Sequence, residues 1–218
     1  MIRGLIFDFD GLILETEGPI YQSWQEIYHS YGCHLPFDSW TNIIGTADYE
    51  FEPIAELERQ YGAQLDHQGL QVRHQQLEAD MIVVLSAMPG VQGYLDDAKG
   101  LGLKIGLASS SPCEWVTGHL DRLGLTHYFD CIKGSDDVLR TKPDPRLFLA
   151  VLEELELGAD EAVVLEDSPN GVLAAKRAGI FCVAVPNSMT RDLKFDHADM
   201  RLESLEDLSL KKLLQLAN

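Results

Sequence analysis

Residues 2–11 read Ile-Arg-Gly-Leu-Ile-Phe-Asp-Phe-Asp-Gly and give the clearest evidence of fold class in the sequence. An apolar run that ends in Asp8 and Asp10 is typical of a buried parallel strand that stops at a polar loop. Similar apolar runs occur at residues 103–108, 131–133, 162–165 and 181–185. From residue 90 onward, segments with helical spacing separate these runs. The alternation predicts an α/β fold in which helices cover both faces of a doubly wound parallel sheet.

The helical segments are indicated by the spacing of apolar residues and by the residues that follow them. One apolar face lies within residues 91–98, before Gly100, and another lies within residues 147–155, before Gly158. Residues 15–88 show helical spacing but no convincing strand. The sequence therefore predicts a core formed by residues 1–14 and 89–218, with a helical domain inserted at residues 15–88.

The composition excludes several classes of partner. The chain has 218 residues and a formal net charge of −18, so it lacks the excess of cations that binding to nucleic acid or to an anionic membrane needs. No stretch approaches the roughly 20 apolar residues of a membrane span. We therefore expect a small-molecule partner, no nucleic-acid or membrane partner, and a monomer or weak homodimer.

The N-terminus and the cysteines indicate a cytoplasmic protein. Asp8 and Asp10 stand where a signal peptide needs its apolar centre. The four cysteines form no Cys-x-x-Cys pair and resemble free core thiols more than a disulfide framework or a metal site. A reducing environment is the one that this cysteine usage favours.

Polar side chains follow the apolar runs at the points where strands are expected to end. In an open parallel sheet, ligands bind outside the carboxyl ends of the strands. The residues found there, together with a lysine from the Thr-Lys-Pro-Asp segment, are Asp8, Asp10, Ser109, Lys142, Glu166 and Asp167. We expect these side chains to form one site.

The residue types in this set suit phosphoryl transfer. A phosphate monoester is a dianion, so a carboxylate nucleophile such as Asp8 meets strong repulsion in a pocket of low dielectric. A divalent cation and Lys142 would offset this negative charge. The oxygen ligands that Asp8 and Asp167 offer favour Mg²⁺. Glu166 either binds the metal directly or supports the residues that do.

The other polar residues have distinct expected roles. Asp10 can protonate the departing alkoxide and then take a proton from the water that attacks the aspartyl phosphate. Ser109 either donates a hydrogen bond to a phosphate oxygen or caps the helix that follows it. Lys142 would neutralise charge on the nucleophile and on the transferred group.

Four short motifs in this order resemble those of the haloacid dehalogenase superfamily. They are Asp8-Phe9-Asp10-Gly11, residues 105–109, Lys142-Pro143 and Glu166-Asp167-Ser168. A closer resemblance to the β-phosphoglucomutase-like phosphatases rests on Glu15-Thr16-Glu17, Trp24 and residues 165–168. The resemblance spans nearly the whole chain, because the family's helical cap falls where residues 15–88 lie.

The resemblance implies a Rossmann-like core and an aspartyl-phosphate intermediate on Asp8. It also implies that Asp8, Asp167 and the main-chain carbonyl of Asp10 hold Mg²⁺. We assign substrate binding to Ser110 and to two cap residues beyond Gly45, Thr46 and Asp48. The cap residues have a second interpretation, in which they cap the helix that follows.

These observations favour a magnesium-dependent phosphatase that hydrolyses a small phosphate monoester of the sugar or polyol type. Asp10 argues against a dehalogenase, which needs no second carboxylic acid. A phosphonatase of this fold needs a cap lysine, whereas the first lysine here is Lys99. A non-catalytic binding or regulatory module is a third class, which the complete set of motif residues disfavours.

The main alternative is a β-phosphoglucomutase-type mutase, which must hold a second phosphate in its cap. Known mutases carry a histidine and an arginine where this sequence has Ile20 and Asp48. Residues 15–88 contain 12 aspartates and glutamates, and their lysine and arginine content is limited to Arg59 and Arg73. Such an acidic cap suits a neutral polyol or an amine-bearing leaving group better than a second phosphate.

Overall fold

The computed structural model describes residues 1–41, 44, 45 and 51–217. Within these residues the core contains a six-stranded sheet in the order β3-β2-β1-β4-β5-β6, with parallel pairing throughout. The strands are β1 (Gly4–Phe7), β2 (Lys104–Ala108), β3 (Cys131–Lys133), β4 (Ala162–Glu166), β5 (Phe181–Ala184) and β6 (Met200–Arg201). The predicted α/β fold with a parallel sheet is confirmed.

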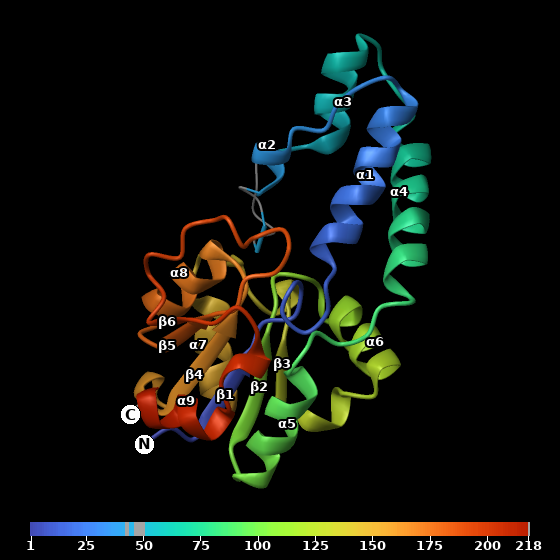
Figure 1. Cartoon of the computed structure of the whole chain (residues 1–218). Helices are drawn as coiled ribbons and strands as arrows, with labels where there is room; N and C mark the ends of the chain where they lie inside the picture. Colours follow the sequence, from blue (N-terminus) through green and yellow to red (C-terminus); the bar gives the residue numbers. More distant parts are fainter. Residues whose placement is uncertain (42–43, 46–50, 218) are drawn as a thin grey trace.

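Helices cover both faces of this sheet (Figure 1). The core helices are α5 (Val91–Gly100), α6 (Cys113–Leu123), α7 (Arg146–Glu154), α8 (Pro169–Arg177) and α9 (Leu210–Ala217). Short 3-10 turns lie at Thr126–Tyr128, Ser135–Asp137, Ala159–Glu161 and Leu205–Asp207. Both chain termini lie at the end of the core that is farthest from the inserted helices (Figure 1).

The side chains of β1 alternate between two apolar clusters. Leu5 and Phe7 pack with residues of α5, α6 and α9, whereas Ile6 packs with residues of α7 and α8. Successive side chains of a strand point to opposite faces, so a strand buried on both faces must be apolar throughout. This is why the sequence of β1 reads as a continuous apolar run rather than an alternating one.

The inserted segment forms four helices among the described residues. They are α1 (Glu17–Ser30), α2 (Phe37–Thr41), α3 (Pro53–Tyr61) and α4 (His67–Ile82), with α1 and α4 side by side (Figure 1). Their apolar residues form a separate cluster around Tyr28, whose hydroxyl donates to the carbonyl of Pro53 at 2.5 Å. We keep residues 15–88 as the proposed boundaries of this cap.

The outgoing and returning connections of the cap lie together. The amide of Met88 donates to the carbonyl of Ile13 at 2.8 Å. Ile82, the last residue of α4, packs in the same core cluster as Leu12. The two connections therefore enter the core at one place, just beyond the end of β1.

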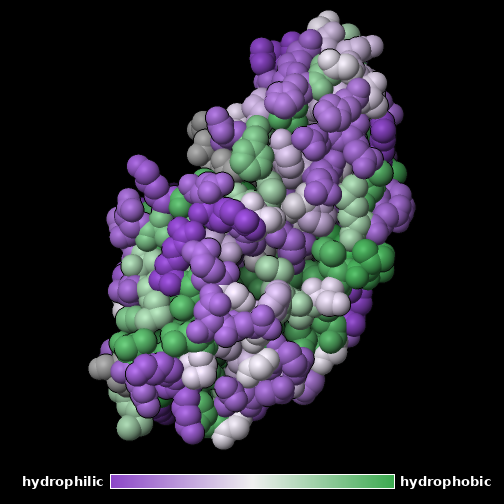
Figure 2. Space-filling model, viewed as in Figure 1, coloured by the Kyte–Doolittle hydropathy of each residue, from purple (hydrophilic) through white to green (hydrophobic). Residues whose placement is uncertain are grey.

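The predicted strand positions agree with the structure to within two residues at each end, and one strand was missed. β6 has two residues, Met200 and Arg201, and a run this short gives no periodic signal. The face shown in Figure 2 is mostly hydrophilic, with smaller hydrophobic areas between. No described helix is both long enough and apolar enough to cross a membrane.

Substitution of a β1 side chain tests the central position of this strand. Leu5 is fully buried, so Leu5→Ala should lower the free energy of unfolding by about 2–5 kcal/mol through lost burial and a cavity. Leu139 is 89% exposed, so Leu139→Ala should change it by less than about 0.5 kcal/mol. Urea unfolding monitored by circular dichroism measures both values, and similar losses for the two variants would contradict this packing.

Candidate active site

The polar residues predicted from the sequence lie at the carboxyl ends of the strands. Asp8 directly follows β1, Ser109 directly follows β2, and Asp167 directly follows β4, whose last residue is Glu166. Parallel pairing of β1 with both β2 and β4 brings these three strand ends to one edge of the sheet. The amide of Asp8 donates to the carbonyl of Leu165 at 3.0 Å, which fixes the end of β1 against the end of β4.

Lys142 enters this edge of the sheet from the loop between β3 and α7. Its ammonium group donates to Glu166 Oε1 at 2.6 Å and also to Asp8 Oδ1. Its Nζ lies 5.0 Å from the ring centroid of Phe148, and the residue is fully buried. A buried ammonium group needs such partners, because burial without them would favour its neutral form.

Burial and mutual repulsion disturb the titration of the carboxyl groups. Burial raises the pKa of Asp8 to about 8, although the charge of Lys142 acts against it. The pKa of Asp167 is also raised, first by burial and then by the negative charges of Glu166 and Asp8. Burial acts to lower the pKa of Lys142, but Asp8 and Glu166 more than offset this and the pKa is raised. The ammonium group contacts Asp8 and Glu166 and acts on Asp167 through its charge, so further positive charge would stabilise the ionised forms of Asp8 and Asp167.

The carboxyl groups of Asp8, Glu166 and Asp167 are arranged in a way that suits a hard divalent cation. Each offers an oxygen, and these oxygens lie within 4.8 Å of one another in a buried setting. Both oxygens of Glu166 already accept hydrogen bonds, one from Lys142 and the other from the amide and hydroxyl of Ser168. The donor set and its uncompensated charge fit Mg²⁺.

Asn187, which was not among the residues predicted from the sequence, holds Asp167 in place. Its Nδ2 donates to Asp167 Oδ2 at 2.7 Å and to the carbonyl of Gly11 at 3.2 Å. A Cβ at Gly11, where φ is +81°, would lie 2.3 Å from both Asn187 Nδ2 and Asp167 Oδ2, so this close approach requires glycine. Asn187 lies just beyond β5, and the strand-end rule that found the other residues also applies to it.

Asp10 faces a different environment from Asp8. Its Oδ1 accepts hydrogen bonds from Thr16 Oγ1 at 2.8 Å and from Trp115 Nε1 at 2.9 Å. Its Oδ2 accepts from Ser111 Oγ at 2.7 Å and from Ser109 Oγ at 3.1 Å. Of these four donors, only Ser109 directly follows a predicted strand, and sequence spacing gives no signal for Thr16, Ser111 or Trp115 as partners of Asp10.

The cap meets the core at the loop that contains Ile44 and Gly45. Ser110 Oγ donates to the carbonyl of Gly45 at 3.0 Å, and Asn170 Nδ2 donates to the carbonyl of Ile44 at 2.9 Å. A Cβ at Gly45 would lie 2.1 Å from Ser168 Oγ, so a larger residue would not fit there. Ser110, predicted to bind substrate, thus joins the core to the cap in this structure. Thr46 and Asp48 lie outside the described residues.

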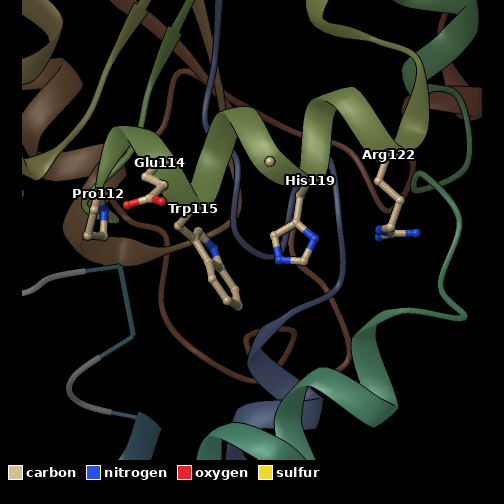
Figure 3. A pocket seen from close by; sticks show the side chains of 6 residues that line it. Pro112, Glu114, Trp115, His119 and Arg122 are labelled. Carbon is tan, nitrogen blue, oxygen red and sulfur yellow. The ribbon is translucent and has the colours of Figure 1, made fainter.

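A hollow of about 530 Å³ lies beside α6, on the side that carries Trp115. Figure 3 shows Trp115, His119 and Arg122 projecting into it from the same side of the helix. The rings of Trp115 and His119 meet edge to face, with centroids 4.4 Å apart. Arg122 donates to the carbonyl of Leu85 at 2.8 Å and so joins α6 to the returning connection of the cap.

Comparison with known proteins identifies the family. The family model for haloacid dehalogenase-like hydrolases matches residues 5–185. The chain belongs to the haloacid dehalogenase-like hydrolase family. The resemblance, the Rossmann-like fold and the enzyme class inferred from the sequence motifs are therefore confirmed.

Individual relatives of this hydrolase match most or all of its length. It is 47% identical over 218 residues to the "Putative phosphatase YhcW" of Bacillus subtilis (strain 168), covering 100% of this chain and 99% of that protein. It is 34% identical over 179 residues to the "Phosphorylated carbohydrates phosphatase" of Thermotoga maritima, covering 82% of each. Among solved structures, a "putative beta-phosphoglucomutase" from Thermotoga maritima superimposes with a TM-score of 0.81 at 30% identity, covering 99% of this chain and 100% of that one.

Magnesium should stabilise this hydrolase, and the gain should grow with pH. Folding raises the pKa of Asp8 and Asp167, so their contribution to stability is fullest below the unfolded pKa of about 4 and is lost as the pH rises toward about 8. A cation binds the ionised carboxylates and reverses this loss. At a hundredfold excess over Kd the stabilisation is about 2.7 kcal/mol, or roughly 5–11 °C in midpoint.

Thermal unfolding with MgCl₂ or EDTA, at about pH 5 and about pH 8, measures this effect. Asp167→Asn should lose the magnesium-dependent shift. Asp80 is exposed on α4 and accepts a hydrogen bond from Gln76 Nε2 at 2.9 Å, so Asp80→Asn should keep the shift. An equal shift at both pH values, or a full shift in Asp167→Asn, would contradict a metal site at these carboxylates.

Asn187→Ala should weaken magnesium binding by about 10–100-fold, because Asp167 would lose the donor that orients it. Ser188→Ala is the matched neighbour: Ser188 Oγ donates to Glu15 Oε2 at 3.2 Å and touches neither Asp167 nor Gly11 in any hydrogen bond described for the chain. Isothermal titration with MgCl₂ compares the two variants with the wild type. Unchanged affinity in Asn187→Ala would show that Asp167 does not need this contact.

Proposed function

We propose that this hydrolase is a magnesium-dependent phosphatase that releases phosphate from a small monoester of the sugar or polyol type. The observation that carries the proposal is the contrast between two aspartates at one strand end. Asp8 lies among carboxylates beside the ammonium group of Lys142, whereas Asp10 lies among four uncharged donors. Two carboxyl groups with such different surroundings suit a nucleophile and a proton-transfer group.

Asp8, Asp167 and the main-chain carbonyl of Asp10 are the residues that would hold Mg²⁺. When bound, Mg²⁺ would neutralise charge on the phosphate and on the carboxylates around it. Glu166, whose two oxygens are occupied by Lys142 and Ser168, would act by holding Lys142 rather than by binding the metal. Of the two roles that the sequence left open for Glu166, these contacts support the second.

In the first half-reaction, a carboxylate oxygen of Asp8 attacks phosphorus and the bond to the leaving oxygen breaks. Lys142 stabilises the ionised form of Asp8 and the charge on the transferred group. Ser109 donates its hydroxyl hydrogen to a phosphate oxygen. Asp10 gives its proton to the leaving oxygen, so that an alcohol departs.

In the second half-reaction, water attacks the phosphorus of the aspartyl phosphate. Asp10, now ionised, accepts a proton from this water, and the bond between phosphorus and Asp8 breaks. Inorganic phosphate leaves and both aspartates return to their starting states. One carboxyl group therefore serves both half-reactions.

The cap supports a leaving group without a second negative charge. Burial and then the charge of Asp10 raise the pKa of Glu78 to about 7, and the same two causes raise the pKa of Glu17. Burial lowers the pKa of His74 to about 4, so its ring, stacked on Trp24 at 4.4 Å, is neutral at physiological pH. These groups, which lie within electrostatic reach of Asp10 or pack beside Trp24, add no positive charge.

The mutase is a second candidate because a structural relative carries the name "putative beta-phosphoglucomutase". It would need cations in the cap for a second phosphate. Arg59 is paired with Glu56 at 2.6 Å, and Arg73 donates to Ser30 Oγ at 3.0 Å. By sequence, these two arginines are the lysine and arginine content of residues 15–88, and both already have partners within the cap. Relatives named as phosphatases also favour hydrolysis.

Phosphate release from sugar, polyol, nucleotide and small-acid phosphates, with and without Mg²⁺, tests the proposal. Asp8→Asn should reduce release to background, because an amide cannot form the aspartyl phosphate. Asp10→Ala should lower kcat by about 10²–10⁴-fold through loss of proton transfer. Asp80→Asn makes the same change of charge on an exposed face of α4 and should match the wild type.

The acidic cap should also make neutral and amine-bearing leaving groups better than acidic ones such as phosphoglycolate. Comparable turnover of phosphoglycolate would contradict this part of the proposal. Isomerisation of glucose 1-phosphate in the presence of a bisphosphate, without phosphate release, would establish the mutase. Magnesium binding with no turnover of any compound would indicate a non-catalytic module.

A further inference from the structure

The four donors to Asp10 are divided between its two oxygens. Oδ1 accepts from Thr16 at 2.8 Å and from the indole of Trp115 at 2.9 Å. Oδ2 accepts from the hydroxyls of Ser111 and Ser109, at 2.7 and 3.1 Å. A protonated carboxyl group donates through one oxygen only. The way the donors are divided therefore indicates which oxygen of Asp10 carries the proton and which one is held in place.

The donors on the Oδ2 side can be released without moving a side chain. A serine hydroxyl has one hydrogen and rotates freely. Ser109 cannot give its hydrogen to Asp10 and to a phosphate oxygen at the same time. When it turns to the phosphate, as the proposed reaction requires, Oδ2 loses a donor and can carry the proton that the leaving oxygen takes.

The indole N–H of Trp115 differs, because its direction is fixed by the position of the whole ring. That ring packs against His119 edge to face, with centroids 4.4 Å apart, and His119 stacks on Phe9 at 6.2 Å. Phe9 is the residue between the two aspartates and is fully buried. The chain of rings therefore ties the donor to the same strand end that carries Asp8 and Asp10.

The two donors to Oδ1 also come from different parts of the molecule. Thr16 directly precedes α1 and belongs to the connection that leads into the cap. Trp115 belongs to α6, which packs on the sheet through Val116 and Leu120. Of this pair, Trp115 is the donor that keeps a fixed place relative to Asp8 if the cap moves.

We propose that Trp115 is a positioning residue: it holds Oδ1 of Asp10 so that Oδ2 carries the proton given to the leaving oxygen. The inference rests on the proposed phosphatase reaction. In the step concerned, the bond from Oδ2 to hydrogen breaks and a bond from hydrogen to the leaving oxygen forms. At the same time, the bond between Asp8 and phosphorus forms and the ester bond to phosphorus breaks. Trp115 itself exchanges no atom.

Trp115→Phe tests this role, because it removes the N–H and keeps an aromatic ring against His119. The two substrates are the best sugar phosphate of the panel, whose alkoxide needs a proton, and p-nitrophenyl phosphate, whose phenolate departs without one. The ratio kcat/KM reports steps up to formation of the aspartyl phosphate. For the sugar phosphate it should fall about tenfold. For p-nitrophenyl phosphate it should stay within about twofold, because no proton transfer is needed.

Trp40→Phe is the matched control. It makes the same chemical change, but Trp40 lies in the apolar cluster of the cap, which does not include Asp10. It should leave the ratio between the two substrates at the wild-type value. Circular dichroism confirms that each variant is folded at the assay temperature, and turnover of p-nitrophenyl phosphate shows that its active site is assembled.

Each outcome of the assay decides for or against the role of Trp115. A loss confined to the sugar phosphate supports it. Equal losses on both substrates, or no loss on either, would overturn it while leaving the phosphatase in place. A wild-type protein that releases phosphate from neither compound would overturn the proposed function and this inference with it.

Discussion

The ammonium group of Lys142, buried between Asp8 and Glu166, is the contact on which the rest of the site depends. Carboxylates in a dry environment repel each other and resist ionisation, and here burial raises the pKa of both Asp8 and Asp167. One fixed ammonium group offsets part of this cost, and a divalent cation would offset more. Removing the ammonium group of Lys142 would leave buried negative charge without a partner, which typically costs a protein about 3–5 kcal/mol of stability.

The parallel sheet supplies the second constraint. Because β1 lies between β2 and β4, their carboxyl ends bring residues from three distant segments to one edge. The loops that follow β1, β2 and β4 can therefore be short and still bring their side chains into contact. Gly11 shows how tight this meeting is, since any side chain there would collide with Asn187 and Asp167. Dense packing around the carboxylates keeps water out and strengthens every electrostatic contact among them.

The two aspartates show how a strand end separates chemical roles. Asp8 and Asp10 are two residues apart, yet one faces Lys142 and the carboxylates while the other faces hydroxyl and indole donors. A turn stabilised by contacts of Gly11 and Ile13 with neighbouring carbonyls directly follows β1 and sends the chain toward the cap. Ser110 and Asn170 of the core donate hydrogen bonds to the carbonyls of Gly45 and Ile44 in the cap, so the cap meets the core close to the candidate site.

The amino-acid sequence alone predicted the α/β fold and six polar residues of the candidate site, five of them at or just beyond the ends of strands and Lys142 in a loop. Apolar runs and the polar residues that stop them are local signals, and a parallel sheet has few ways to arrange them. Only the tertiary structure decided that Trp115, Ser111 and Asn187 hold Asp10 and Asp167, because these contacts join side chains up to 105 residues apart. It also decided that β6 exists, since two residues carry no period of their own and form a strand only where β5 offers an edge. Local pattern reveals where a strand ends, whereas the partner of each side chain there follows from the packing of the whole chain.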